Sequence, residues 1–237
     1  MKQYEMVINV MAKNGGYATL GFLHQNVYVK DWKTKTPFAS IRRIVQDSRY
    51  FFKIRPGLWA LKSHQKEVLK EFNIESKKKA DIEKFNHTYY QGLIVEIGNL
   101  KGYKTYVPPQ DRNKLFLAKK LAYLAGLDRI YEFTYEDVLR KAKTIDVIWF
   151  NDRKYPNSLF EVEHTTDIYN SLIKFYDLQD FNTKFHIVSS VIRKREFEQK
   201  INSNAFQSIK NKVHFIDYDF ISDLHTKTFE LAALGSL

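Results

Sequence analysis

The sequence has no cysteine among its 237 residues. Without thiols the chain has no disulfide bonds, no thiolate zinc site and no cysteine nucleophile. No apolar run approaches the length of a membrane span, and the N-terminus shows no secretory signal, so we expect a cytoplasmic protein with no membrane partner. The sequence also lacks internal repeats and a Gly-rich phosphate loop of the Walker type, so nothing in it implies a nucleotide-driven motor.

Positive charge is concentrated in the first third of the chain. Residues 1–80 hold 16 Lys and Arg against 6 Asp and Glu, whereas residues 81–237 hold 22 against 21. The first part therefore has a net charge of +10, out of +11 for the whole chain. Such asymmetry indicates a polyanion partner for the N-terminal part. The length leaves room for one small and one medium domain, each with its own core.

Two short apolar segments carry the acidic residues that suggest chemistry. Residues 145–150 and 159–165 are rich in β-branched and aromatic residues and are flanked by turn residues, so we predict two strands. Side chains alternate along a strand, so Glu161 and Glu163 share one side, and a hairpin would bring Asp146 beside them. Three converging carboxylates repel one another unless a cation lies between them, and Mg²⁺ prefers oxygen ligands. Alternating acids also occur on ordinary solvated strand faces. The order of the predicted helices and strands before and after these acids is what favours a metal site here.

This arrangement resembles the PD-(D/E)xK nuclease superfamily, the fold of most type II restriction endonucleases, over roughly residues 85–224. In that family an Asp on one strand and an acid-x-Lys on the next bind the metal. Asp146 and Glu161 match these acids, and the resemblance implies Mg²⁺ held by both carboxylates and by the carbonyl of Val162. Glu163 stands where the family usually has Lys. Its role stays open between orienting or deprotonating the attacking water and binding a second metal.

The same resemblance implies further catalytic candidates. The family often has an acidic residue on the helix before its first strand, and Glu96, in a predicted helix over 85–97, matches that position. The positive charge that the motif lacks has two candidate sources. One is Lys174 on a predicted helix over 167–181, if that helix packs over the site, and the other is Lys104 on the strand before the acids.

The remaining predicted elements follow the α/β order of such a nuclease core. We expect a strand at 185–189, a helix at 194–209 and a last strand at 213–216. Residues 109–143 form an insertion, for which the sequence predicts one helix over 115–126 and another beginning at Thr134.

The N-terminal third predicts three helices followed by a hairpin. The helices are expected over 1–11, 19–29 and 36–47, and the strands at 50–54 and 58–62 flank the turn Arg55-Pro56-Gly57. This order resembles a winged helix-turn-helix, in which the third helix enters the DNA major groove and the hairpin wing reaches the flanking backbone.

The winged-helix resemblance implies which side chains contact DNA. They are Ser40, Arg42, Arg43 and Gln46 on the third helix, with Lys53 and Arg55 on the wing. Arginine donors suit guanine edges and glutamine suits adenine. Winged helices also bind proteins, but the high positive charge favours DNA.

We therefore predict an α/β protein with a winged-helix (α+β) domain at 1–72, a linker at 73–84 and a restriction-endonuclease-like mixed-sheet domain at 85–237. We expect a Mg²⁺-dependent, sequence-specific endonuclease of the type II restriction class that cuts double-stranded DNA. A homodimer is expected, because cutting both strands needs two sites and one chain offers one. The alternatives are a DNA-binding transcriptional regulator with an inactive nuclease-like domain, and a non-specific repair or phage-defence nuclease.

Overall fold

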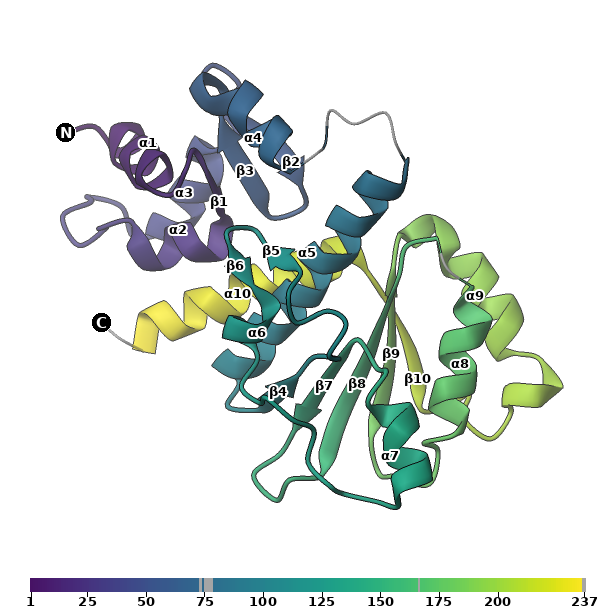
Figure 1. Cartoon of the computed structure of the whole chain (residues 1–237). Helices are drawn as coiled ribbons and strands as arrows, with labels where there is room; N and C mark the ends of the chain where they lie inside the picture. Colours follow the sequence, from purple (N-terminus) through teal and green to yellow (C-terminus); the bar gives the residue numbers. More distant parts are fainter. Residues whose placement is uncertain (73, 75–78, 166, 236–237) are drawn as a thin grey trace. The chain divides into compact units, whose positions relative to one another are not determined.

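The structure is a computed structural model that describes residues 1–72, 74, 79–165 and 167–235. The chain folds into two compact units, and the first contains the described residues of Met1–Ile82 and Ser222–Leu237. The second unit is Glu83–Ile221, so the unit boundaries lie within helices α5 (Lys79–Leu100) and α10 (Tyr218–Gly235) (Figure 1). The sequence prediction had grouped 222–237 with the second domain. Of the predicted linker at 73–84, residues 73 and 75–78 lie outside the described residues.

The first unit contains the predicted order of three helices and a hairpin. Its elements are α1 (Gln3–Lys13), β1 (Tyr17–Thr19), α2 (Leu20–Asn26), α3 (Pro37–Ile44), β2 (Phe51–Arg55), β3 (Leu58–Leu61), the 3₁₀ turn Lys62–His64 and α4 (Gln65–Glu71). The three-stranded sheet has the order β1-β3-β2, with both pairs antiparallel. Gly57 closes the hairpin at φ +74°, a left-handed conformation that suits glycine. Strand β1 and helix α4 were not predicted.

Local signals explain where the helices of this unit begin. Thr19 caps α2 by accepting a hydrogen bond from the Phe22 amide at 3.1 Å, and Pro37 occupies the first turn of α3. The three helices then bury apolar residues in one core that includes Met11, Leu23 and Ile41. The predicted helical periodicity is therefore confirmed in the first unit.

The second unit is built on a five-stranded mixed sheet with the order β10-β9-β8-β7-β4. The strands are β4 (Lys104–Tyr106), β7 (Val147–Phe150), β8 (Pro156–Glu163), β9 (Lys184–Ser189) and β10 (Val213–Asp217). Strands β8, β9 and β10 run parallel, whereas β7 is antiparallel to both of its neighbours. The predicted α/β class with a mixed sheet is confirmed.

Helices cover both faces of this sheet (Figure 1). On one face lie α8 (Ile168–Tyr176) and α9 (Lys194–Ile201), where Leu172 and Phe175 join the core formed with Phe150 and other strand residues. On the other face α5 packs against β7, and the Trp149 indole of β7 donates a hydrogen bond to the Ile94 carbonyl of α5 at 3.1 Å. The apolar runs of β7 and β8 are thus buried on both sides, which matches their composition.

The insertion before β7 differs from its prediction. The helix expected over 115–126 is wrong: β5 (Leu115–Phe116) and β6 (Lys119–Lys120) form a hairpin, followed by the short helix α6 (Leu121–Leu124). Leu117 turns the hairpin at φ +52°, a conformation that an α-helix does not contain. Phe116 packs against α5 at Gly92, where an added Cβ would lie 2.1 Å from its ring. Tertiary packing therefore prevails over helical spacing here.

Two smaller differences concern helices of the second unit. The helix predicted over 194–209 ends at Ile201, and a 3₁₀ turn follows at Asn204–Phe206. The helix predicted from Thr134 is α7, Glu136–Ala142. None of the helices among the described residues has the length and apolarity needed to cross a membrane.

Candidate active site

The end of the β7–β8 hairpin brings two of the predicted acids together. Asp146 immediately precedes β7, and Val147 pairs with Phe160 of β8. Asp146 Oδ2 accepts a hydrogen bond from the Val162 amide at 2.8 Å, and the Asp146 amide donates to Glu161 Oε1 at 3.4 Å. The predicted strand pairing is confirmed, and Asp146 lies beside Glu161 as expected.

Glu161 and Glu163 share the face of β8 that α8 covers. The Ser171 hydroxyl of α8 contacts Glu161 Oε2 at 3.1 Å and also contacts Glu163 Oε1. A hydroxyl carries one proton and can donate it to only one of these carboxylates. Ser171 of α8 therefore lies between the two glutamates, and its hydroxyl proton satisfies one of them at a time.

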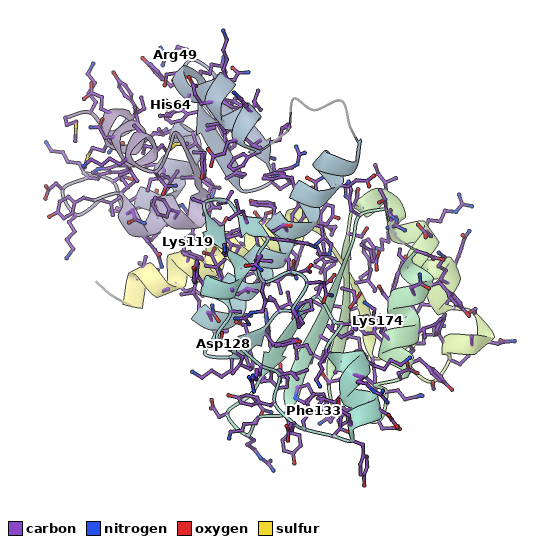
Figure 2. The ribbon with its side chains drawn as sticks, viewed as in Figure 1. Arg49, His64, Lys119, Asp128, Phe133 and Lys174 are labelled. Carbon is purple, nitrogen blue, oxygen red and sulfur yellow. The ribbon has the colours of Figure 1, made fainter. Side chains whose placement is uncertain are left out.

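Among the described ion pairs of the site, the pair of Lys174 with Glu161 places a positive charge beside the two glutamates. It lies one turn after Ser171 on α8, between that helix and the sheet in Figure 2, and its Nζ donates to Glu161 Oε2 at 2.8 Å. The same ammonium donates to the Thr144 carbonyl at 3.2 Å. Capping by Asp167, which accepts from the Tyr169 amide at 2.9 Å, fixes the start of this helix. The condition stated for Lys174, that its helix packs over the acids, is met.

Lys104, the second lysine candidate, lies elsewhere. It is exposed on β4, at the edge of the sheet, where it pairs with Phe150. Phe150 is four residues beyond Asp146, a distance of about 13 Å along a strand. The structure therefore does not bring Lys104 to the acids.

Burial and mutual repulsion set the protonation of the acids. Burial raises the pKa of Glu161 well above its usual range, and the Asp146 carboxylate raises it further, against the opposing effect of Lys174. Burial alone would raise the pKa of Asp146, but the charge of His87, its hydrogen bond and the Val162 amide hold that pKa below its usual range. Perturbed acids of this kind concentrate at functional sites.

Sequence reasoning missed three residues that surround Asp146. His87 Nε2 lies 3.1 Å from Asp146 Oδ2, and Gln91 Nε2 donates both to the Asp146 carbonyl at 2.8 Å and to Asp111 Oδ2 at 2.9 Å. Asp111 is buried in the loop after β4 and forms an ion pair with Lys114. Burial lowers the pKa of His87, but Asp146 more than compensates and raises it. The sequence does carry one signal for these residues: His87 and Gln91 are polar, lie four positions apart and therefore share one face of the predicted helix over 85–97.

Glu96 is not brought into this group by the helix that carries it. It follows His87 by nine residues, which corresponds to a rotation of about 180° around α5. His87 and Gln91, rather than Glu96, are the residues through which α5 contacts Asp146.

The predicted DNA-contacting residues of the first unit differ in exposure. Arg43, Gln46 and Lys53 are exposed, and Arg55 is half-buried with its guanidinium donating to the Ile54 carbonyl at 2.8 Å. Ser40 is buried, and its hydroxyl donates to the Thr36 carbonyl at 3.2 Å, which is inconsistent with the predicted DNA contact. The placement of Ser40 corrects the sequence analysis.

Arg42 of α3 is engaged within the first unit. Its guanidinium forms an ion pair with Glu230 of α10, beside the buried His24. The predicted recognition helix therefore presents only part of its polar side.

Comparison with known protein sequences found a matching family and a similar protein. The family described as "Type II restriction enzyme NmeDI C-terminal domain" matches residues 68–234. The type II restriction enzyme NmeDI of Neisseria meningitidis serogroup C is 24% identical over 153 residues, which cover 60% of this chain and 43% of that relative. The chain thus spans less than half of the relative's length. No solved structure matches.

Proposed function

The chain belongs to the family of the type II restriction enzyme NmeDI C-terminal domain, and we propose that it is a Mg²⁺-dependent endonuclease that cuts double-stranded DNA at a specific sequence. The observation that carries the proposal is the buried pair of Asp146 and Glu161 with Lys174 beside it. This group supports a site like that of the PD-(D/E)xK nucleases, in which the following helix would supply the lysine.

The residues at this site fit a hard divalent cation. Asp146 and Glu161 offer carboxylate oxygens, and the carbonyl of Val162 between the two β8 glutamates is a further oxygen donor. The raised pKa of Glu161 shows that burial and Asp146 leave its negative charge insufficiently compensated, despite Lys174. A bound Mg²⁺ would supply that compensation, lower the pKa of a coordinated water and stabilise charge on the scissile phosphate.

The other side chains have roles that follow from their contacts. Lys174 holds Glu161 in place through its 2.8 Å hydrogen bond and adds positive charge where a phosphate would enter. Glu163, held by Ser171, is the carboxylate that accepts the proton of the attacking water at Oε1 or Oε2.

We assign DNA recognition to the first unit. Its order α1-β1-α2-α3-β2-β3 and its sheet order β1-β3-β2 support a winged helix, and its net charge supports a phosphate backbone as partner. Arg43 of α3 and Gln46, which lies two residues after that helix, are available for base edges, and Lys53 with Arg55 contact phosphates. Two chains act as a homodimer, with one active site for each strand.

The proposal is tested by incubating the protein and phage DNA with Mg²⁺ and separating the products by size. We expect discrete fragments with the wild type and none with Asp146→Asn. The matched control is Asp152→Asn, which changes an exposed Asp in the β7–β8 turn and should leave the fragments unchanged. A smear would show a non-specific nuclease, and binding without any cutting in Mg²⁺ or Mn²⁺ would favour an inactive domain; either outcome overturns the proposal.

A further inference from the structure

On the α5 side of Asp146, the polar residues His87 and Asp111 have no role in the mechanism above. His87, Asp111 and Asp146 each present one ligand atom, and these atoms all lie within 4.8 Å of one another. They come from α5, from the loop after β4 and from the start of β7, so three separate elements converge. Ligand atoms around a divalent cation with bonds of about 2.1 Å lie roughly 3 to 4 Å apart, so a small closure would complete such a site.

Gln91 provides an independent indication of a ligand. Its side chain is fully buried, and its amide nitrogen donates to two oxygens of the group, on Asp111 and on Asp146. Its Oε1 is buried, and among the described residues it has no hydrogen-bonding partner. Buried amide oxygens are normally satisfied, because an unpaired one costs free energy. A cation, or water bound to that cation, would satisfy this oxygen.

The chemistry of the donors determines which cation fits. The group at Glu161 offers only oxygen atoms, which suits Mg²⁺, whereas His87 adds an imidazole nitrogen. Imidazole favours transition metals over Mg²⁺ and Ca²⁺. We infer that His87, Asp111 and Asp146 form a second cation site, with Gln91 as its buried oxygen donor, and that this site takes Mn²⁺ or Co²⁺ in preference to Mg²⁺. The inference rests on the proposed function only through Asp146, which both sites share.

Lys114 acts as the competitor of that cation. Its ammonium forms an ion pair with Asp111, and its half-exposed side chain can leave the carboxylate without disturbing the core. Removal of this charge should therefore tighten cation binding, whereas a purely structural role of the group predicts no gain of affinity from losing an ion pair.

The test is a Mn²⁺ titration of the full-length protein, with free Mn²⁺ followed by electron paramagnetic resonance. We expect two Mn²⁺ per wild-type chain and one per chain for His87→Asn, in which the second site weakens by at least about 100-fold because a direct ligand is lost. His214→Asn, which removes an exposed histidine of β10 in the same unit, should retain both. Lys114→Gln should bind the second Mn²⁺ about 5-fold more tightly.

The outcomes separate this inference from the proposed function. Two Mn²⁺ on a protein that does not cut DNA would leave the second site in place and overturn only the nuclease proposal. Wild-type protein with a single Mn²⁺ that Glu161→Gln removes, or His87→Asn with unchanged binding of both, would overturn the second site. If His87→Asn loses its near-ultraviolet circular dichroism, the Lys114→Gln affinity decides: unchanged or weaker binding rejects the inference.

Discussion

The Lys174–Glu161 ion pair is the most direct test of the site, because its removal has a calculable effect on stability. The Glu161 side chain is 3% exposed and that of Lys174 is 29% exposed, with 2.8 Å between Nζ and Oε2. Lys174→Met keeps the length and the apolar stem of the side chain but leaves Glu161 buried beside Asp146 without its ammonium. Breaking a fully buried ion pair from one side costs about 3–5 kcal/mol. Because Lys174 is partly exposed, we expect a loss of about 2 kcal/mol in the free energy of unfolding.

The double variant Glu161→Gln/Lys174→Met separates the pair from its surroundings. It removes both charges, so no unpaired ion stays buried, and we expect it to be more stable than the sum of the two single changes by at least about 1 kcal/mol. The matched control is Lys141→Met, which removes an exposed pair with Asp177 at 3.3 Å and should cost less than about 1 kcal/mol. Lys174→Met and the double variant should both fail to cut DNA.

The measurement is urea-induced unfolding followed by far-ultraviolet circular dichroism, in EDTA at pH 8. Addition of Mg²⁺ should restore part of the stability of Lys174→Met, because a cation bound by Asp146 and Glu161 compensates the same charge. If the two single changes add within about 0.5 kcal/mol, Lys174 and Glu161 are not coupled in the folded protein, and the assignment of Lys174 as the relocated motif lysine is refuted.

Three further predictions concern other parts of the chain. Burial, together with Arg42, lowers the pKa of His24 from 6.5 to about 4, so protonation favours the unfolded state as the pH falls below 6.5. The free energy of unfolding should therefore drop by about 2 kcal/mol between pH 7 and pH 5. Urea unfolding of His24→Gln should show a smaller drop over the same pH range. The double variant Arg43→Ala/Gln46→Ala should bind a cleavable duplex at least about 10-fold more weakly in fluorescence anisotropy, whereas Ser40→Ala should change the affinity less than about 2-fold. Equal losses of affinity in the two variants would argue against α3 as the helix that reads the DNA sequence. Cleavage should require Mg²⁺ or Mn²⁺ and stop in EDTA, and Ca²⁺ should support binding without cutting; full activity in EDTA would exclude the metal mechanism.

The sheet and the acid pair could be predicted because their determinants are local. Apolar β-branched runs with a short polar connection define the β7–β8 hairpin, and side-chain alternation then places Glu161 and Glu163 together. Asp146 follows from the hairpin register. The mixed sheet follows from the order of helices and strands, since parallel strands need the crossover helices that the periodicity indicates.

What could not be predicted depends on contacts between segments distant in sequence. His87 meets Asp146 across 59 positions, and Arg42 meets Glu230 across 188, so no local pattern encodes either pairing. The β5–β6 hairpin was missed because its apolar residues have helical spacing, while its turn uses Leu117 rather than a glycine that would reveal a positive φ.

The position of Lys174 shows why a motif defined by sequence spacing is weaker than the charge requirement behind it. A buried Glu161 beside Asp146 needs a nearby cation whichever element carries it, because repulsion and burial both act against its charge. On β8 the side chains nearest to Glu161 on its face are at positions 159 and 163, and neither is basic, whereas α8 covers the same face and reaches Glu161 from thirteen positions further along. Once α8 supplies the ammonium, position 163 is free to carry a carboxylate, and Ser171 on the same helix holds that carboxylate in place. Ser171 and Lys174 therefore reach the two glutamates from one face of α8, and in the proposed nuclease Lys174 would compensate for the motif lysine that position 163 lacks.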